Sequence, residues 1–404
     1  MYIKRFLEEE VLVASKSFPI VLVTGPRQVG KTTMLEKIKD DNRKYVSLDH
    51  PIARDMAKTD PELFLERYSP PVIIDEIQYA PELLSFIKMY VDRNKQPGDF
   101  WLTGSQMFHL MKNASESLAG RVAVIQMQGL SGSELYGSNH GVFTTNLKLL
   151  IERMASQRKQ NLSQVYEHIF YGSMPALQKN YEDRERFYSS YVDTYLQRDI
   201  RDLTQVGDEL TFFRFMCVCA ARTSQMLNYS ELAREVGISQ PTAKHWLSLL
   251  VSSGIVTLVE PYYNNRLKRL VKSPKLYFMD TGLCAFLTRW DGPETLEISA
   301  MSGAFFETYV IGEIIKSFLN NGKRPPIFYY RDSDQKEIDL VIEQNNMLFP
   351  IEIKKSANPG KKAVQHFSVL KKSDKDLGDG GVVCLVSDVL PIDQRNCFIP
   401  VWLI

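Results

Sequence analysis

The stretch Gly25-Pro26-Arg27-Gln28-Val29-Gly30-Lys31-Thr32 decides the fold of the first part of this chain. It has the complete pattern G-x-x-x-x-G-K-[ST] of a phosphate-binding loop. The apolar run 20–24 precedes it as a predicted buried strand, and residues 33–38 follow as a predicted helix. This order lets backbone N–H groups surround phosphate oxygens at the N-terminus of a helix. A plain strand–helix turn is the alternative, which the full pattern in this context disfavours.

The loop has a specific chemistry. Lys31 would reach the β- and γ-phosphates of a nucleotide, and the Thr32 hydroxyl would ligate Mg²⁺. Together with the next residue, Thr33, the quoted stretch is the predicted nucleotide-binding loop. We therefore expect ATP and Mg²⁺ as ligands.

Composition and charge set further limits. The chain has 404 residues, enough for two or three domains, and is 44% hydrophobic and 24% charged. Because the net charge is +1, any surface for nucleic acid must be local. The five cysteines form no C-x-x-C pair, so we expect reduced thiols and no zinc site. The N-terminal residues lack the apolar core of a signal peptide, and no run approaches the length of a membrane span. We expect a cytoplasmic protein without a membrane partner.

Strand and helix patterns alternate from residue 20 to about residue 135. This alternation predicts a parallel sheet covered by helices on both faces, with ligands at the carboxyl ends of the strands. The predicted strands after the first are 44–48, 72–76, 99–105 and 122–127, and the clearest helices are 81–92 and 106–118.

Polar residues follow several of these strands. Asp75 and Glu76 end the predicted strand 72–76. One acid would hold Mg²⁺ there, and the next would orient the attacking water. A pair of solvated acids is the alternative interpretation. If the 99–105 strand lies between the first strand and the Asp75 strand, Thr103 or Ser105 would face the γ-phosphate as a sensor. Arg121, before the 122–127 strand, would supply transition-state charge to its own or a neighbouring subunit, or is a surface residue.

These residues carry a family resemblance. The strings 25–33, 72–78 (VIIDEIQ), 102–106 (LTGSQ) and 117–121 (SLAGR) resemble the AAA-type ATPase domain of many prokaryotic ATP-binding proteins. The resemblance implies an ATPase domain followed by a second, nuclease-like domain of uncharacterised function, and it covers nearly the whole chain.

The middle of the chain contains a helix-turn-helix pattern. Residues 138–162 have no clear period and are expected to be a connection, and residues 183–206, with the family string YLQRDI at 195–200, are expected to be one long helix. A capped helix from Tyr229, a turn at Gly237 and a helix from Gln240 then form the motif. Strands 255–259 and 275–278 would form a wing. Basic residues without an acid lie between or on these strands: Arg266, Lys268, Arg269, Lys272 and Lys275.

This winged helix would bind DNA through Lys244 of its second helix and through Arg266, Lys268 and Arg269 of the wing. Gln240 and His245 are further candidate readers. The alternative is a protein-interaction module, a role that winged helices also have in ATPases.

The C-terminal part combines carboxylates with a lysine. A predicted helix over 301–320 contains Glu307, and Asp339 lies on a predicted strand that pairs with the strand of Glu352 and Lys354. Alternation places Glu352 and Lys354 on one face, where Asp339 would meet them. Two carboxylates and a lysine suit Mg²⁺ binding beside a phosphodiester, with Asp339 and Glu352 as ligands. An edge hairpin with exposed charges is the alternative.

This arrangement resembles the PD-(D/E)XK nuclease core. The resemblance implies that Asp339 and Glu352 bind Mg²⁺, that Lys354 lies near the attacking water, and that Glu307 is the acid of the first helix. Gln365 matches a polar position on the following helix. Ile338 replaces the proline that usually precedes the aspartate.

We therefore predict an α/β protein with the following parts: a P-loop ATPase domain at 1–137, a connection and helical region at 138–228, a winged helix at 229–282 and a nuclease-like domain at 283–404. The predicted function is Mg²⁺-dependent ATP hydrolysis coupled to a DNA-binding half, in a possible homo-oligomer. The alternatives are a nucleotide-gated switch with little turnover and a non-catalytic docking domain, and a metal-dependent DNase.

Overall fold

The computed structural model describes residues 2–105, 118–138, 141–155, 157, 159–178, 183–195, 209–263 and 273–404. The chain divides into two compact units. The first is Met1–Leu130 with the short segments Ser252–Gly254 and Leu319–Lys323, and the second contains the rest. The helix-turn-helix and the C-terminal sheet thus belong mainly to one unit, and each unit is described by itself.

The first unit is built on a parallel sheet with the strand order β2-β3-β4-β1-β5. Its strands are β1 (Ile20–Thr24), β2 (Lys44–Ser47), β3 (Val72–Asp75), β4 (Phe100–Gly104) and β5 (Val122–Gln126). The strands predicted from the sequence are confirmed, and β4 lies between β1 and β3 as expected.

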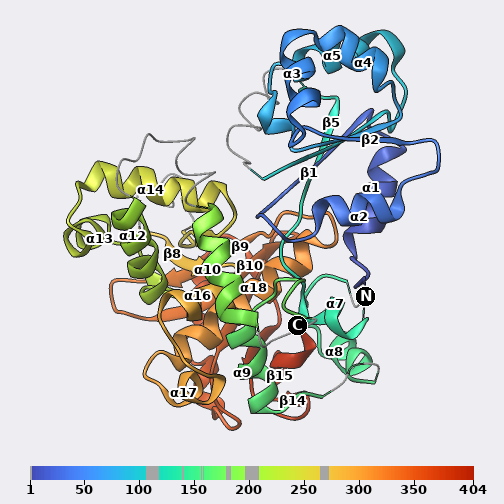
Figure 1. Cartoon of the computed structure of the whole chain (residues 1–404). Helices are drawn as coiled ribbons and strands as arrows, with labels where there is room; N and C mark the ends of the chain where they lie inside the picture. Colours follow the sequence, from blue (N-terminus) through green and yellow to red (C-terminus); the bar gives the residue numbers. More distant parts are fainter. Residues whose placement is uncertain are drawn as a thin grey trace. The chain divides into compact units, whose positions relative to one another are not determined.

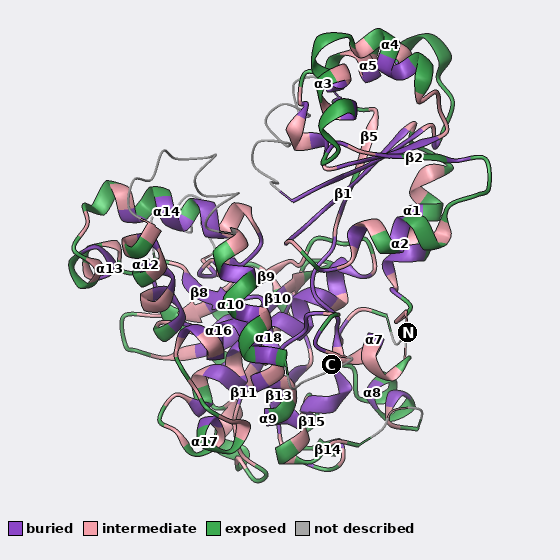
Figure 2. Cartoon of the chain, in the orientation of Figure 1, coloured by how far each residue is buried: buried purple, intermediate pink, exposed green. Residues whose placement is uncertain are grey.

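Helices cover both faces of this sheet (Figure 1). One face carries α1 (Leu7–Ser15) and α2 (Lys31–Ile38), and the other carries α3 (Pro51–Thr59), α4 (Pro61–Arg67) and α5 (Leu83–Asn94). The short 3₁₀-helix η1 (Ile77–Tyr79) follows β3. Every residue of β1, β3 and β4 is buried, as Figure 2 shows, which is why these strands read as continuous apolar runs. Most of the predicted helix 106–118 lies outside the described residues.

The segment after the first sheet is helical, including part of the stretch 138–162 that was predicted to be a connection. The elements are α7 (Gly132–Tyr136), α8 (Leu147–Met154), α9 (Leu162–Tyr171) and α10 (Arg184–Tyr195). The prediction for 138–162 is wrong at α8, where the Asn146 side chain caps the helix by accepting from the Leu149 backbone N–H and Leu150 is buried. Neighbouring polar residues hid this short apolar face. Helix α10 confirms the first half of the predicted helix 183–206, and most of the string YLQRDI lies outside the described residues.

The two helices predicted on either side of Gly237 are confirmed. Its elements are α12 (Glu209–Ala221), β6 (Gln225–Met226), α13 (Tyr229–Val236), α14 (Gln240–Ser252), β7 (Val256–Val259) and β8 (Lys275–Phe278), followed by α16 (Thr281–Leu287) and α17 (Pro293–Ile298). Asn228 caps α13, and Gly237 ends it with φ +83°, the left-handed conformation that the turn requires. The strands pair in the order β6-β8-β7.

The C-terminal part is a mixed sheet preceded by the long helix α18 (Ser302–Leu319). The strands are β9 (Ile327–Arg331), β10 (Glu337–Gln344), β11 (Met347–Ile353), β12 (Asp376–Leu377), β13 (Gly380–Cys384), β14 (Leu390–Pro391) and β15 (Asn396–Pro400). The order is β14-β15-β13-β11-β10-β9, with β12 also paired to β11. Strands β9, β10 and β11 are antiparallel, whereas β11, β13 and β15 are parallel.

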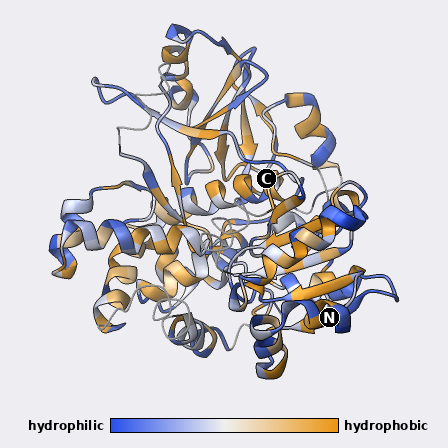
Figure 3. Cartoon of the chain, turned by 90° about the horizontal axis from the view of Figure 1, so that it is seen from above, coloured by the Kyte–Doolittle hydropathy of each residue, from blue (hydrophilic) through white to orange (hydrophobic). Residues whose placement is uncertain are grey.

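Short 3₁₀-helices replace the α-helix expected around Gln365. They are η4 (Lys361–Val364) and η5 (Phe367–Lys372), and η6 (Val401–Leu403) ends the chain. Gln365 caps η4 and is exposed, so the resemblance at this position is wrong about the α-helix. In Figure 3 the strands are coloured mainly as hydrophobic and the turns as hydrophilic, as expected of buried sheets.

Candidate functional site

The phosphate loop lies between β1 and α2 and touches the segment after β5. Gly25 has φ +145°, and a Cβ at this position would lie 1.9 Å from the Met127 carbonyl oxygen. Gly30, the N-cap of α2, has φ +92°. The first glycine is therefore required by a backbone contact and the second by backbone conformation.

Two buried cations hold this loop. Lys31 Nζ donates to the carbonyl oxygens of Gly25, at 3.0 Å, and Pro26, at 2.7 Å. Arg5 is 2% exposed and donates to the carbonyl oxygens of Val29 and Gln128, each at 2.8 Å. Arg5 thus ties the loop to the chain after β5. The sequence analysis missed it, because nothing in the local pattern marks an N-terminal arginine as buried.

Asp75 is the centre of a hydrogen-bond network at the carboxyl ends of the strands. Its Oδ1 accepts from Thr32 Oγ1 at 2.7 Å and from Thr103 Oγ1 at 2.5 Å, and its Oδ2 accepts from Tyr45 OH at 3.2 Å. The network brings together the two residues that were predicted to hold Mg²⁺, Thr32 and Asp75. Hydroxyl and carboxylate oxygens are the ligand atoms that Mg²⁺ prefers, so these residues fit the ion.

Tyr45 was not predicted as a site residue. Burial, and then the charge of Asp75, raise the pKa of Tyr45 to about 12, so the phenol keeps its proton for the hydrogen bond to Asp75.

Glu76 has a strained backbone and a fixed side chain. Its φ is +58°, which a residue other than glycine rarely adopts, and its N–H donates to Thr103 Oγ1 at 3.1 Å. Gln78 Nε2 donates both to Glu76 Oε2 and, at 3.1 Å, to Ser105 Oγ. Gln78 therefore joins two predicted catalytic residues, and it was not itself predicted.

Arg121 lies at the amino ends of the strands, whereas the phosphate loop lies at their carboxyl ends. It precedes β5, which runs parallel to β1 with Val122 beside Ile20 and Gln126 beside Thr24, so it is a strand length away from the phosphate loop. Its guanidinium donates to Asp92 at 2.5 and 3.1 Å and to the Ala119 carbonyl oxygen. This geometry does not fit a role at the nucleotide site of its own subunit, and a role at a neighbouring subunit stays a prediction beside that of a surface residue.

The predicted DNA-binding residues differ in accessibility. Lys244 and His245 are exposed on α14, whereas Arg266, Lys268, Arg269 and Lys272 lie outside the described residues. Lys275, predicted to contact phosphate from the wing, is 4% exposed, so that prediction is wrong. Its charge is directed into the protein.

Lys275 reaches a group of acids in the C-terminal part, the acidic cluster, which consists of Glu307, Glu337, Asp339 and Glu352. Its Nζ lies 3.2 Å from Glu307 Oε1 on α18 and 2.7 Å from Glu337 Oε1 on β10. Tyr277, two residues further along β8, donates to the same Glu307 oxygen at 2.7 Å.

The predicted meeting of Asp339, Glu352 and Lys354 is confirmed. Lys354 Nζ lies 2.6 Å from Glu352 Oε1 and 3.8 Å from Asp339 Oδ2, which also accepts from the Ile353 backbone N–H at 2.8 Å. Among the described residues, however, no three Asp, Glu, His or Cys side chains are arranged to hold a metal ion. Two lysines pair with the acids of this cluster, and the assignment of Asp339 and Glu352 as Mg²⁺ ligands stays a prediction.

Burial and mutual repulsion change the pKa values of these groups. Burial, with the charges of Glu307 and Glu352, raises the pKa of Asp339 to about 8. Burial also raises the pKa of Glu352. Burial lowers the pKa of Lys275, but the surrounding acids outweigh it, so this pKa lies above its usual value and the lysine stays charged.

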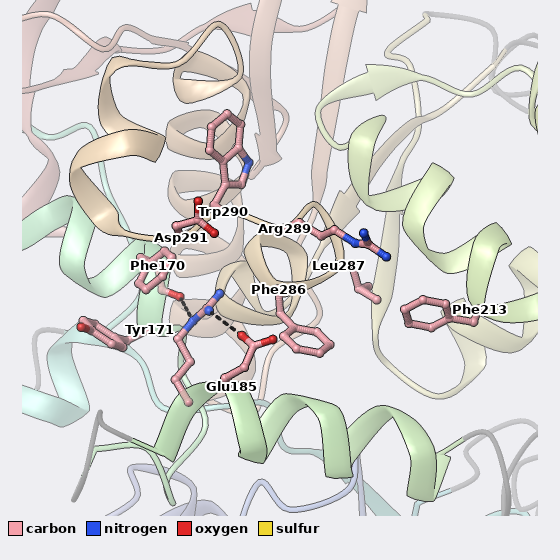
Figure 4. Close-up of a pocket in the computed structure, with 10 residues that line it drawn as sticks. Phe170, Tyr171, Glu185, Phe213, Phe286, Leu287, Arg289, Trp290 and Asp291 are labelled. Carbon is pink, nitrogen blue, oxygen red and sulfur yellow. Dashed lines mark hydrogen bonds and ion pairs between the residues drawn. The ribbon is translucent and has the colours of Figure 1, made fainter. Parts of the chain in front are cut away.

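A pocket of about 730 Å³ lies in the helical part of the second unit (Figure 4). Aromatic side chains of α9, α12 and α16 line it together with Arg184 of α10. Arg184 donates to the Phe170 carbonyl oxygen at 2.9 Å and pairs with Glu185 at 3.7 Å. The lining residues include none of the predicted site residues.

Comparisons with known protein families match three successive segments of the chain. A family described as "AAA domain" matches residues 17–136. Residues 162–294 match a domain of unknown function (DUF8612), and residues 302–404 match another (DUF4143). The first unit thus contains an AAA-type P-loop ATPase domain, which implies ATP binding and hydrolysis.

Two curated relatives are similar over most of the chain. They are the uncharacterized proteins Rv2008c of Mycobacterium tuberculosis and Mb2031c of Mycobacterium bovis, each 30% identical over 344 residues, which are 84% of this chain and 71% of the relative. The chain belongs to their family.

Solved structures are more distant. The Walker-type ATPase PABY2304 of Pyrococcus abyssi is 13% identical, with a TM-score of 0.43 over 71% of this chain and 96% of that one. A RuvB variant of Thermotoga maritima is 15% identical, with a TM-score of 0.31 over 62% and 88%. Within the residues that the structure describes, every helix of this family member is too short or too polar to span a bilayer.

Proposed function

We propose that the protein is a Mg²⁺-dependent ATPase whose nucleotide state controls a DNA-binding second half. The hydrogen-bond network of Asp75 is the observation that supports hydrolysis most strongly. It joins the end of the phosphate loop, through Thr32, to a strand-end carboxylate and to the polar tip of β4. Through Thr103 it also joins the acid that would hold Mg²⁺ to Glu76, the residue that would orient the attacking water.

Each residue of the network would have a separate role. Lys31 would bind the β- and γ-phosphates once a nucleotide replaces its present carbonyl partners. Thr32 and Asp75 would hold Mg²⁺, which neutralises phosphate charge when bound. Glu76 would accept a proton from, or orient, the attacking water, with Thr103, Gln78 and Ser105 positioning it.

Replacing Lys31 tests this proposal. We expect Lys31→Ala to lower the ATP hydrolysis rate at least about 100-fold, because the phosphates lose their main cation. Lys37→Ala is the matched control, since Lys37 is exposed on the same helix. ATP hydrolysis that is unchanged in Lys31→Ala would show that this loop is not the active site.

The second half offers two features that support DNA binding. Helix α14 exposes Lys244 after a helix-turn-helix turn, and residues 264–272 contain four basic residues and no acid. The C-terminal part also has the element order of the nuclease-like resemblance, with Glu307 on the helix, Asp339 on β10 and Glu352 on β11. Phosphate contacts from such a half would be salt-dependent.

A second candidate function is a nucleotide-gated switch with little turnover, in which the nuclease-like part is a docking domain. The ion pair of Lys275 with Glu307 favours the docking role, because it neutralises one acid of the predicted nuclease site. Single-turnover ATP assays with Glu76→Gln as the control separate switch from ATPase. Nicking of plasmid, linear and branched DNA with Mg²⁺ or Mn²⁺ by wild type and Asp339→Ala tests a DNase. Equal cleavage by both proteins would indicate a contaminant.

A further inference from the structure

The acidic cluster of the C-terminal sheet contains a cation that comes from a different part of the chain. Lys275 belongs to β8, in the small sheet of the winged helix, whereas the acids lie on α18, β10 and β11. Its side chain is 5% exposed and touches Glu307 and Glu337 at ion-pair distances. No motif in the sequence links Lys275 to these acids.

The position of Lys275 is fixed by its neighbours. Strand β8 is central in its sheet, so Lys275 pairs with Met226 on one side and Val259 on the other. Tyr277, on the same face of β8, donates to Glu307. The strand pairing therefore fixes the backbone of Lys275, and the ion pairs with the acids fix its side chain.

The two sheets are also joined directly. The Tyr329 N–H donates to the Glu260 carbonyl oxygen at 3.0 Å, and the Tyr262 N–H donates to the Tyr329 carbonyl oxygen. The Tyr329 hydroxyl donates to the carbonyl oxygen of Ser273, two residues before Lys275. Backbone hydrogen bonds thus bring the wing strands to β9 of the C-terminal sheet.

A lysine and a divalent metal ion compete for the same acids. The ammonium group is a compact charge with three donors, and each ion pair that it makes lowers the negative charge that the carboxylate offers to Mg²⁺. The cluster contains a second cation, Lys354, beside Asp339 and Glu352. Two internal cations thus neutralise the acids of this cluster.

We propose that Lys275 is the resident cation of this acidic cluster and excludes a divalent metal ion from it. In this state the cluster attaches the winged helix to the C-terminal sheet and does not cleave a phosphodiester. The arrangement makes the C-terminal part a docking domain built on a nuclease-like scaffold. The proposal depends on contacts within the second unit and not on ATP hydrolysis.

Mn²⁺ binding to the full chain without nucleotide tests the proposal. The titrations, followed by electron paramagnetic resonance, compare wild type with Asp339→Asn, Lys275→Met, Lys275→Arg and Lys275→Met/Asp339→Asn. Wild type and Asp339→Asn should bind Mn²⁺ equally. Lys275→Met should gain a site at least about tenfold tighter than any in wild type, and the additional Asp339→Asn change should abolish it. Lys275→Arg, which keeps the positive charge, should gain none.

Two results would overturn the proposal. One is Mn²⁺ binding, or DNA nicking, that depends on Asp339 in the wild-type protein. The other is a folded Lys275→Met protein, judged by circular dichroism and ATP hydrolysis, that gains no site. If Lys275→Met does not fold, the comparison of wild type with Asp339→Asn decides. ATP hydrolysis measured on the same samples reports separately on the proposed ATPase.

Discussion

Gly25 has to be glycine because of a single atom. A Cβ at this position would lie 1.9 Å from the Met127 carbonyl oxygen, and φ is +145°. Since backbone atoms on both sides would have to move, we expect Gly25→Ala to lower the free energy of unfolding by about 1–3 kcal/mol and to abolish ATP binding. Urea denaturation and nucleotide titration measure the two effects.

Gly120→Ala separates crowding from backbone strain. Gly120 has φ +76° in the same unit, but a Cβ there would meet no atom of the described residues within 4 Å. This variant should lose stability without losing ATP binding. Equal ATP affinity in Gly25→Ala and Gly120→Ala would mean that the contact with Met127 does not shape the loop.

Thr103 bonds to both acids that the proposed hydrolysis requires. Its hydroxyl donates to Asp75 and accepts from the Glu76 N–H. We expect Thr103→Val to lower the ATP hydrolysis rate by about 10–100-fold, because both acids lose their position, whereas Thr103→Ser keeps most of the rate. Steady-state hydrolysis measures this effect. A Thr103→Val enzyme with the rate of Thr103→Ser would assign the hydroxyl no positioning role.

The candidate site was predictable where chemistry is local in sequence. Lys31, Thr32 and Asp75 belong to motifs whose spacing fixes their geometry, and the structure brings Thr32 and Asp75 together. Arg5 and Tyr45 were not predictable, because their partners, Gln128 and Asp75, become neighbours only after folding. Gln78 lies within the acidic motif, but its two acceptors depend on how β3 and β4 pair.

At the scale of elements, α14 is the recognition helix of the proposed DNA-binding module. Lys244 is exposed on it. We expect Lys244→Ala to weaken binding to duplex DNA and to reduce the slope of log K against log salt by about 1, since one phosphate contact is lost. Fluorescence anisotropy at several salt concentrations measures both quantities.

Lys58→Ala provides the comparison for this experiment. Lys58 is exposed on α3 of the first unit, so its loss changes the net charge equally without touching the winged helix. If both variants weaken DNA binding to the same extent, α14 is not the contact surface and the winged helix has another role.

The contact between α7 and α9 makes stability depend on pH. His168 Nε2 and Tyr136 OH lie 2.6 Å apart, and burial lowers the pKa of His168, although Glu313 and Glu167 oppose this effect. A histidine whose folded pKa is depressed binds a proton more readily when unfolded, so stability falls as the pH falls below about 6.5. We expect His168→Gln to flatten this dependence.

Urea unfolding between pH 5 and pH 8 measures the effect. The wild-type free energy of unfolding should decrease more steeply toward pH 5 than that of His168→Gln. If the two curves are parallel, protonation of His168 does not contribute to acid destabilisation.

Elements were predicted well when one signal dominated and poorly when tertiary contacts decided. The turn at Gly237 and the cap at Asn228 fixed the helix-turn-helix locally. Helix α8 was missed because its apolar face is short and lies among polar residues. Lys275 was read as a solvent-facing wing residue, since only the pairing of β8 with β6 and β7 reveals that its side chain is buried.

At the scale of the whole molecule, the sequence predicted parts in the right order but not how they join. The wing strands and the C-terminal sheet share backbone hydrogen bonds through Tyr329 and ion pairs through Lys275. Such contacts connect residues far apart in sequence and leave no periodic pattern. They explain why the elements after Ser131 fall mainly into one compact unit.

Arg121 raises the question of assembly. Because it lies at the amino ends of the strands and its own phosphate loop lies at their carboxyl ends, we propose that it acts at the site of a neighbouring subunit. A ring or filament with head-to-tail contacts would bring Arg121 of one subunit to the phosphate loop of the next. We therefore expect Arg121→Ala to lower ATP hydrolysis at least about 100-fold, as the loss of an arginine supplied from a neighbour does. Asp92→Asn, which removes the ion pair and keeps the guanidinium, should retain activity.

Mixing inactive variants tests this assignment. Lys31→Ala keeps its arginine but loses its site, and Arg121→Ala keeps its site but loses its arginine. If subunits mix at random, about one quarter of the interfaces combine an intact site with an intact arginine, so the mixture should regain up to about a quarter of the wild-type rate. Arg121→Ala with normal activity would make Arg121 a structural partner of Asp92. A mixture as inactive as its components would exclude an arginine shared between subunits.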